Sequence, residues 1–366
     1  MESEVTGGIG SLQDLVRALP QDEQELFHRI FRVDETVGEL TVPAKMREWI
    51  EEQFGPVEAV ERQRIIKVTN LVTLEGALFN ELRGRRPMES RSEGDWEQAV
   101  AGGSGGPFCT PLDATPEDVF GRVKGSYCVT ASNVAKADGF HGLVVFDEHN
   151  PLRFSEAGVK DYFDTALLWM NAAHSHDKEA CYFFLMWNCL WRSGASILHG
   201  HAQMTLSKGM HYAKIEHQRR AALLYKIGHG TDYFEDLYAV HRNLGLGLEV
   251  NGVRILANLT PIKEKEVLLL APVLDDRIKR ASYRVLRCLV DKLGVRSFNL
   301  ALCLRPIDST PEDWTGFPAI VRIVDRGDLD NRTSDIGAME LYASSVISGD
   351  PFRLVSALAS SMEQSQ

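Results

Sequence analysis

The sequence predicts an α+β fold with a largely antiparallel sheet flanked by helices. The apolar runs of strand length occur mostly in neighbouring pairs, so few βαβ units can be built from them. Between these pairs lie segments with the apolar spacing of amphipathic helices. The chain has 366 residues, of which 44% are hydrophobic and 25% charged, enough to bury a core as one large domain or two modest ones.

Composition also excludes several classes of partner. A net charge of −11 argues against a protein built to coat nucleic acid or an anionic membrane, although a few arginines and backbone amides can still hold a small phosphate-bearing substrate. The beginning, "MESEVTGGIG", does not resemble a signal peptide, and no apolar run approaches the roughly 20 residues that span a bilayer. The six cysteines lack CxxC spacing. A cytoplasmic protein with reduced thiols is expected.

Residues 1–62 are expected to form an acidic N-terminal extension, mostly helical over 11–55. "ERQRIIKVTN" then predicts a strand, and "GALFNELRGRRP" runs to a proline stop. Residues 89–107 are polar and rich in glycine, and are expected to connect the first part of the chain to the second.

The central and final parts continue with alternating strand pairs and helices. A helix begins after Ser155, a good N-cap residue, and runs through "EAGVKDYFDTALLWMNAAHSH". Further helices are expected near 212–227, 233–242 and 275–293, and from Pro351. Strands are predicted at "SYCVTASN", "GLVVFD", "ACYFFLMWN", "ILHGHAQMTL", "GVRILAN", "EVLLLAP", "SFNLALCL" and "AIVRIVD".

The strand "ILHGHAQMTL" carries the chemistry. In an extended segment His199, His201 and Gln203 share one face. A neutral imidazole can attack a phosphoryl group, and an amide can hydrogen-bond a phosphate oxygen but cannot shuttle a proton. This favours transfer to a bound acceptor over hydrolysis. Taken alone, the two histidines are also compatible with metal binding or simple surface placement.

A longer string, N-x5-G-A-S-x2-H-x-H-x-Q, surrounds these residues. It resembles the active-site signature of the transferase branch of the histidine-triad superfamily, which includes galactose-1-phosphate uridylyltransferase and diadenosine tetraphosphate phosphorylase. The SGAS turn is especially similar to that of the phosphorylase. The segments "LRGRRP", "GPFC", "TASN" and "VVFDEHNPL" resemble uridylyltransferase in the same order, over roughly residues 65–360.

The resemblance implies a histidine-triad-like fold with a catalytic half over residues 63–210 and a second, related half over 211–366. His201 would be the nucleophile that takes the nucleoside monophosphate, with Gln203 and His199 as the other catalytic residues. The remaining matched residues would bind substrate, chiefly its phosphates: Arg83, Arg86, Asn133, Asn188, Gly194 and Ser196. For each arginine, a solvated surface role is the alternative.

The metal sites of the resembled family are only partly matched. The zinc-containing relatives use two cysteines of a CxxC, a histidine of the middle strand and the first histidine of the HxH pair. Here Cys109, His149 and His199 match, but Gly106 stands where the first cysteine would be. Three ligands plus water can hold zinc, although a structural site normally has four protein ligands. The family's second metal site is expected to be absent, and Glu216 and His217 fit a solvated helix face as well as a ligand role.

The sequence therefore predicts an enzyme: a nucleotidyltransferase of the phosphorylase type that acts on a nucleoside diphosphate sugar or a dinucleoside polyphosphate through a nucleotidyl-histidine intermediate. Its partners would be a small nucleotide and a phosphate or sugar-phosphate acceptor, and a homodimer is compatible with the resemblance. The covalent step requires no cofactor. A hexose-1-phosphate uridylyltransferase is the next alternative, and a non-catalytic nucleotide-binding protein is the alternative of another class.

Overall fold

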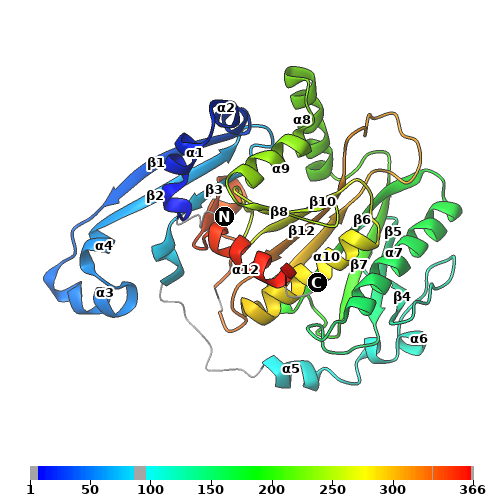
Figure 1. The fold of residues 1–366 in the computed structure, drawn as a ribbon. Coiled ribbons are helices and arrows are strands. Elements are labelled where there is room, and N and C mark those ends of the chain that lie inside the picture. The colour runs from blue at the N-terminus through cyan, green and yellow to red at the C-terminus, as the bar shows by residue number, and fades with distance from the viewer. Residues whose placement is uncertain (1–6, 86–95, 332, 364–366) are drawn as a thin grey trace.

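The computed structural model describes residues 7–85, 96–331 and 333–363. Its strands form two sheets: nine strands in the order β4-β5-β7-β6-β11-β12-β10-β9-β8, and four in the order β1-β2-β3-β13. Every pairing in the large sheet is antiparallel, and in the small sheet only β13 runs parallel to its neighbour. The predicted α+β fold with a largely antiparallel sheet is confirmed (Figure 1).

The large sheet is continuous across the middle of the chain. Strands β4 to β7 form one side and β8 to β12 the other, and they meet where β6 pairs with β11. The boundaries 63–210 and 211–366 stay a prediction. β2 and β3 fall within the first of these ranges but belong to the small sheet. The strands are β4 (Cys128–Ser132), β5 (Phe140–Phe146), β6 (Ala180–Cys189), β7 (His201–Lys208), β8 (Gly247–Val250), β9 (Val253–Ala257), β10 (Val267–Ala271), β11 (Phe298–Cys303) and β12 (Ala319–Asp325).

Two helices pack on one face of the large sheet. The polar side chains of the motif lie on its other face. α7 (Glu156–His176) packs on β4 to β7, and α10 (Asp276–Arg287) packs on α7 and β10 (Figure 1). Ser155 caps α7 as predicted, since its hydroxyl accepts a hydrogen bond from the Gly158 amide at 3.0 Å. Trp169 of α7 lies so close to β5 that a Cβ on Gly142 would come within 2.6 Å of its ring.

The N-terminal extension is mostly helical over 11–55, as predicted, but it also contains a strand that was not predicted. It includes β1 (Phe31–Glu39), which pairs with β2 (Arg62–Asn70) along nine residues, and the resulting ribbon carries two short helices at its outer end (Figure 1). The other elements up to residue 85 are η1 (Ile9–Ser11), α1 (Leu12–Ala18), α2 (Gln21–Ile30), η2 (Ala44–Met46), α3 (Arg47–Phe54), α4 (Val57–Glu61), β3 (Gly76–Phe79) and η3 (Glu81–Arg85).

The glycine-rich connector predicted at 89–107 lies in part outside the described residues. Its described portion begins with a helix, α5 (Trp96–Gly102), which was not predicted. The remaining elements are η4 (Pro107–Cys109), α6 (Pro111–Ala114), η5 (Trp191–Ser193), α8 (Ala213–His229), α9 (Tyr233–Asn243), the π-helix η6 (Cys288–Lys292), α11 (Ala338–Tyr342), β13 (Ser345–Ile347) and α12 (Pro351–Glu363). Among the described residues, no helix combines the length and apolar character needed to cross a membrane.

Candidate active site on the open face of the large sheet

The turn before β7 sets the position of the site. Leu190 has a φ of 63°, η5 follows, and Gly194 ends it with a φ of 93°. A Cβ on Gly194 would meet no atom within 4 Å, so glycine is required there for its backbone conformation and not for space. Ser196, the next predicted phosphate ligand, is exposed just after this turn.

The predicted strand "ILHGHAQMTL" begins later than expected. β7 starts at His201, and His199 lies in the loop before it. Gly200 allows this loop to cross β5 closely, because a Cβ there would lie 2.7 Å from the Phe146 ring and 2.9 Å from the Glu148 carbonyl oxygen. The alternation argument therefore holds for His201 and Gln203 only, and His199 belongs to a separate cluster.

His201 is held in one tautomer. Its Nδ1 lies 2.8 Å from the carbonyl oxygen of His199, and since a carbonyl can only accept, Nδ1 carries the proton. The Nε2 atom of the neutral ring therefore keeps its lone pair. Burial lowers the pKa of His201 and so favours the neutral ring. The Phe108 ring packs edge-on against it, with 5.1 Å between ring centroids.

Gln203 is oriented by a residue that sequence reasoning missed. His141 of β5 accepts a hydrogen bond at Nδ1 from the Ala137 amide, so its Nε2–H donates to Gln203 Oε1 at 3.0 Å. Burial lowers the pKa of His141, which keeps this neutral form. The side-chain amide nitrogen of Asn133 lies 3.5 Å from the same oxygen, so Asn133 lies beside the motif residues with which it was grouped from the sequence. With Oε1 engaged, the NH₂ group of Gln203 is the part left to donate to a ligand.

Asn188 is held in the same way from the next strand. Its Oδ1 accepts from Asn299 of β11 at 2.7 Å, and Asn299 also donates to the Ser193 carbonyl of the turn at 3.0 Å. Arg326 in turn donates to Asn299 Oδ1 at 2.5 Å. A polar row thus runs across β6 and β11 to the end of β12. Asn299 was also not predicted, because its direct pairing with Asn188 follows only from the register of the two strands.

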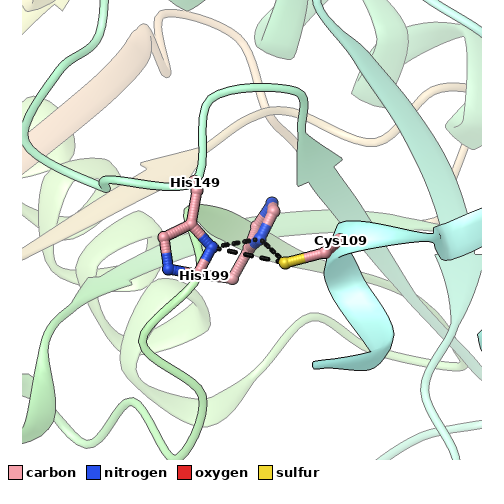
Figure 2. Close-up of side chains that lie close together, drawn as sticks. All are labelled: Cys109, His149 and His199. Carbon is pink, nitrogen blue, oxygen red and sulfur yellow. Dashed lines mark hydrogen bonds between the residues drawn. The ribbon is translucent and has the colours of Figure 1, made fainter. Parts of the chain in front are cut away.

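Cys109, His149 and His199 converge as the metal prediction requires (Figure 2). The two Nδ1 atoms lie 3.0 Å apart, and the Cys109 sulfur lies 3.4 Å from that of His149 and 3.5 Å from that of His199. Tetrahedral zinc with ordinary bond lengths would place its nitrogens about 3.3 Å apart and nitrogen from sulfur about 3.6 Å.

The tautomers of these two histidines support a cation between them. His149 Nε2 lies 2.7 Å from the Val100 carbonyl and His199 Nε2 lies 2.7 Å from the Phe146 carbonyl, so both Nε2 atoms carry protons. In neutral rings the two facing Nδ1 atoms then both present lone pairs, which repel unless a proton or metal ion lies between them. Backbone carbonyls that hold the far nitrogen are typical partners of zinc-binding histidines.

Other predicted residues are not joined to this site. Arg86 lies outside the described residues. Arg83 is exposed in η3 beside the small sheet, and no hydrogen bond or ion pair among the described residues links it to the motif. Glu216 is not on a solvated face: it is buried in α8 and paired with Arg219 and Arg220. His217 bonds the Thr73 carbonyl at 3.0 Å, so the pair does not form a second metal site.

No model of a known protein family and no curated protein matches the sequence. Solved structures do. An ADP-glucose phosphorylase from Arabidopsis thaliana with bound ADP-glucose matches at a TM-score of 0.60 and 14% identity, over 78% of this chain and 95% of that one. A GalT-like protein from the same plant matches at 0.60 and 15%, over 79% and 97%. A uridylyltransferase matches at 0.56 and 14%, over 82% and 99%.

The chain shares its fold with these solved structures. At these identities the likeness shows the fold alone, and this fold is the one that the resemblance implied. In this fold the motif residues occupy the loop before β7, the start of β7 and the end of β6, so His201, Gln203, Asn133 and Asn188 lie on one stretch of open sheet.

Proposed function

We propose that this protein is a nucleotidyltransferase of the phosphorylase type that works through a covalent nucleotidyl-His201 intermediate. The observation that carries the proposal is the fixed tautomer of His201, whose Nε2 lone pair is free for attack while Nδ1–H is held by a carbonyl. The same carbonyl would stabilise the positive charge that the ring gains when Nε2 bonds to phosphorus. Gln203 and Asn188, each with its amide oxygen already engaged, offer NH₂ groups to phosphate oxygens.

The reaction has two displacements at one phosphorus atom. In the first, Nε2 attacks the phosphorus attached to the nucleoside, and the bond to the bridging oxygen breaks with its electron pair leaving on the departing phosphate. In the second, an oxygen of the acceptor phosphate attacks, the N–P bond breaks, and its electron pair returns to Nε2. Gln203 has no proton to shuttle to or from water, which favours a phosphate acceptor.

A nucleoside diphosphate sugar is the first substrate class that we propose, followed by a dinucleoside polyphosphate. The neighbour solved with ADP-glucose shares the fold, and the SGAS turn resembles a phosphorylase. Uridylyl transfer to a hexose 1-phosphate is the next candidate. We also propose that Cys109, His149 and His199 hold a structural zinc ion, because their facing lone pairs need a cation between them. That ion would fix the loop that supplies the His199 carbonyl to His201.

The test is intact-protein mass spectrometry after incubation with nucleoside diphosphate sugars and dinucleoside polyphosphates, without acceptor. We expect an acid-labile mass increase of one nucleoside monophosphate in the wild type and in His229→Ala, a control that removes an exposed histidine from the end of α8. His201→Ala should show no adduct. The mass of the adduct names the base.

The alternatives give different results in the same experiment. An adduct that only a hexose 1-phosphate discharges would indicate the uridylyltransferase reaction. An adduct that persists in His201→Ala would refute His201 as the nucleophile. Saturable nucleotide binding without any adduct would favour the non-catalytic nucleotide-binding protein.

A further inference from the structure

A cavity of about 540 Å³ opens beside the turn that precedes the two histidines, and the steps proposed so far give it no role. Ser193 and Gly194 of this turn line it on one side, and Arg326, Asp330 and Asp335 line it from the chain that follows β12. Its size is within the range of cavities that hold small molecules.

One side chain, Asn299, links this cavity to Asn188. The amide of Asn299 donates to Asn188 Oδ1 at 2.7 Å, and its own Oδ1 accepts from the Arg326 guanidinium at 2.5 Å. Asn299 also donates to the carbonyl of Ser193 at 3.0 Å. Asn188 and Arg326 are thus two hydrogen bonds apart, so a group attached to a phosphate at Asn188 can extend into the cavity.

The charged residues that line the cavity are balanced. They are two arginines and two aspartates, Arg192, Arg326, Asp330 and Asp335. Arg326 donates to both carboxylate oxygens of Asp335, at 2.7 and 2.8 Å. A balanced lining does not attract the additional phosphates that a dinucleoside polyphosphate would place here. It suits a neutral group that carries several hydroxyls.

Arg192 and Asp330 leave a donor and an acceptor unused. The Arg192 side chain is 9% exposed, and its Nη1 donates to the carbonyls of Asn331 and Thr333 at 3.0 and 2.6 Å. Among the described residues its Nε and Nη2 have no acceptor within hydrogen-bond distance, Nη2 lying 4.0 Å from Asp335. In the same part of the chain Asp330 hydrogen-bonds only through its backbone amide, which leaves its half-buried carboxylate as an acceptor. Because a hydroxyl both donates and accepts, adjacent hydroxyls of one sugar can satisfy the two groups.

We propose that this cavity binds the sugar of a nucleoside diphosphate sugar, through Arg192 and Asp330. The inference rests on the proposed function, for which it names the substrate class. His201 Nε2 attacks the phosphorus attached to the nucleoside, the bond from that phosphorus to the bridging oxygen breaks, and the electron pair leaves on the sugar phosphate. The second phosphate lies near Asn188, outside the cavity, and the sugar itself does not react.

The test compares two donors that share one nucleoside diphosphate, of which one ends in a hexose and the other in a methyl group. Rapid-quench mass spectrometry of adduct formation at increasing donor concentration gives the half-saturating concentration of each. In the wild type we expect the hexose donor to half-saturate at a concentration at least about tenfold lower. Asp330→Asn should reduce this advantage about fivefold or more, because a hydrogen bond to a charged group is stronger than one to a neutral group.

Asp328→Asn is the matched control. It removes the same charge from an exposed residue of the same loop that is not among those lining the cavity, and its amide oxygen can still accept from the Asp330 amide. The advantage of the hexose donor should be unchanged in this variant. Arg192→Gln is a second, independent variant that should reduce the advantage, and thermal unfolding reports whether each protein is folded.

Equal half-saturating concentrations of the two donors in the wild type, or an equal advantage in the wild type and Asp330→Asn, would overturn the inference. An adduct on His201 without any advantage of the hexose donor would refute the sugar site and leave the proposed function standing.

Calorimetry on the unloaded protein covers the case in which no adduct forms with any donor. It compares hexose 1-phosphate with inorganic phosphate, in the wild type and in Asp330→Asn. If the hexose 1-phosphate binds at least about tenfold more tightly and Asp330→Asn reduces this difference, the cavity is a sugar site and the covalent mechanism is wrong. If neither an adduct nor this difference is found, both proposals are refuted.

Discussion

His201, Gln203 and Asn188 each have one polar atom held by the protein and another left for a ligand. The partner that holds each residue lies behind it: the carbonyl of His199, the ring of His141 and the amide of Asn299. Held in this way, the three side chains do not need to reorient when charge develops on a phosphate. Losing such a partner should therefore slow the reaction more than it weakens substrate binding.

His141 gives the sharpest test of this at the residue scale. His141→Phe should lower the rate constant of adduct formation about tenfold or more, because Gln203 is then free to rotate its NH₂ group away from the phosphate. Rapid-quench mass spectrometry at saturating donor measures that constant. In a Gln203→Ala background the same substitution should have little further effect, since the two residues act as a unit. Equal losses in both backgrounds would contradict a positioning role.

The residues of the candidate site could be predicted from the sequence, but their tautomers and hydrogen-bond partners could not. His201, Gln203, Asn133 and Asn188 follow from the motif and from the resemblance it carries. Which nitrogen of His201 is protonated depends on where the loop places the His199 carbonyl, and no spacing rule gives that. His141 stands in the apolar strand "FHGLVVF", where only the pairing of β5 with β7 brings it to Gln203.

At the scale of elements, apolar content decided which parts of the fold were predictable. Strands such as β6 and β10 are buried along most of their length and were predicted, as was the capped helix α7. β1, "FRVDETVGE", is mostly polar and exposed, and its strand conformation comes from nine pairings with β2. α5 is a single short helix whose Val100 carbonyl supports His149, a contact that its sequence does not suggest.

η4 allows the missing metal ligand to be restored. Gly106 has a φ of −70°, which any residue adopts, and a Cβ there would meet only the Gly103 carbonyl, at 3.3 Å. Gly106→Cys should therefore fold and add a second sulfur ligand near Cys109. We expect zinc affinity to rise at least about tenfold, measured by competition with a chromogenic chelator. Gly105→Cys is the control, because Gly105 has a φ of 90°, which disfavours a side chain. Equal zinc affinities in the two variants would argue against a zinc site at this position.

α8 carries a buried acid whose titration should be visible in stability. Hydrogen bonds from Arg219, and then from Arg220, lower the pKa of Glu216 from its ordinary 4.5 to about 2 and outweigh burial, which raises it. A lowered folded-state pKa means that this stability is complete above pH 4.5 and is lost as pH falls toward 2. The loss should be roughly 2–3 kcal/mol. In urea unfolding between pH 5 and 2.5, Glu216→Gln should flatten this part of the profile; an unchanged slope would show that the pair does not stabilise the fold.

At the scale of the whole molecule, a largely buried cluster of three charged residues joins the two sheets. Arg322 of β12 donates to Glu75, in the turn between β2 and β3, at 2.8 Å, and to Glu266 at 2.8 Å. The Glu266 side chain is fully buried and also accepts from Asn258 and from the Ile262 amide. No local pattern predicts such a contact, because Glu75 and Arg322 are 247 residues apart in the chain. The sequence therefore predicted most strands of the large sheet, but not how the two sheets are joined.

Replacing Arg322 tests how strongly the sheets depend on this group. Arg322→Met should lower the free energy of unfolding by about 3–5 kcal/mol, because it leaves Glu266 buried without its cation. Glu75→Gln should cost much less, since Glu75 is partly exposed and Glu266 keeps its partner. The double variant Arg322→Met, Glu266→Gln should recover part of the loss, because no unpaired charge then remains in the interior. Urea unfolding of the wild type, Arg322→Met, Glu266→Gln and the double variant at pH 7 measures the cycle. Additive losses in the double variant would mean that Arg322 and Glu266 do not act as a pair.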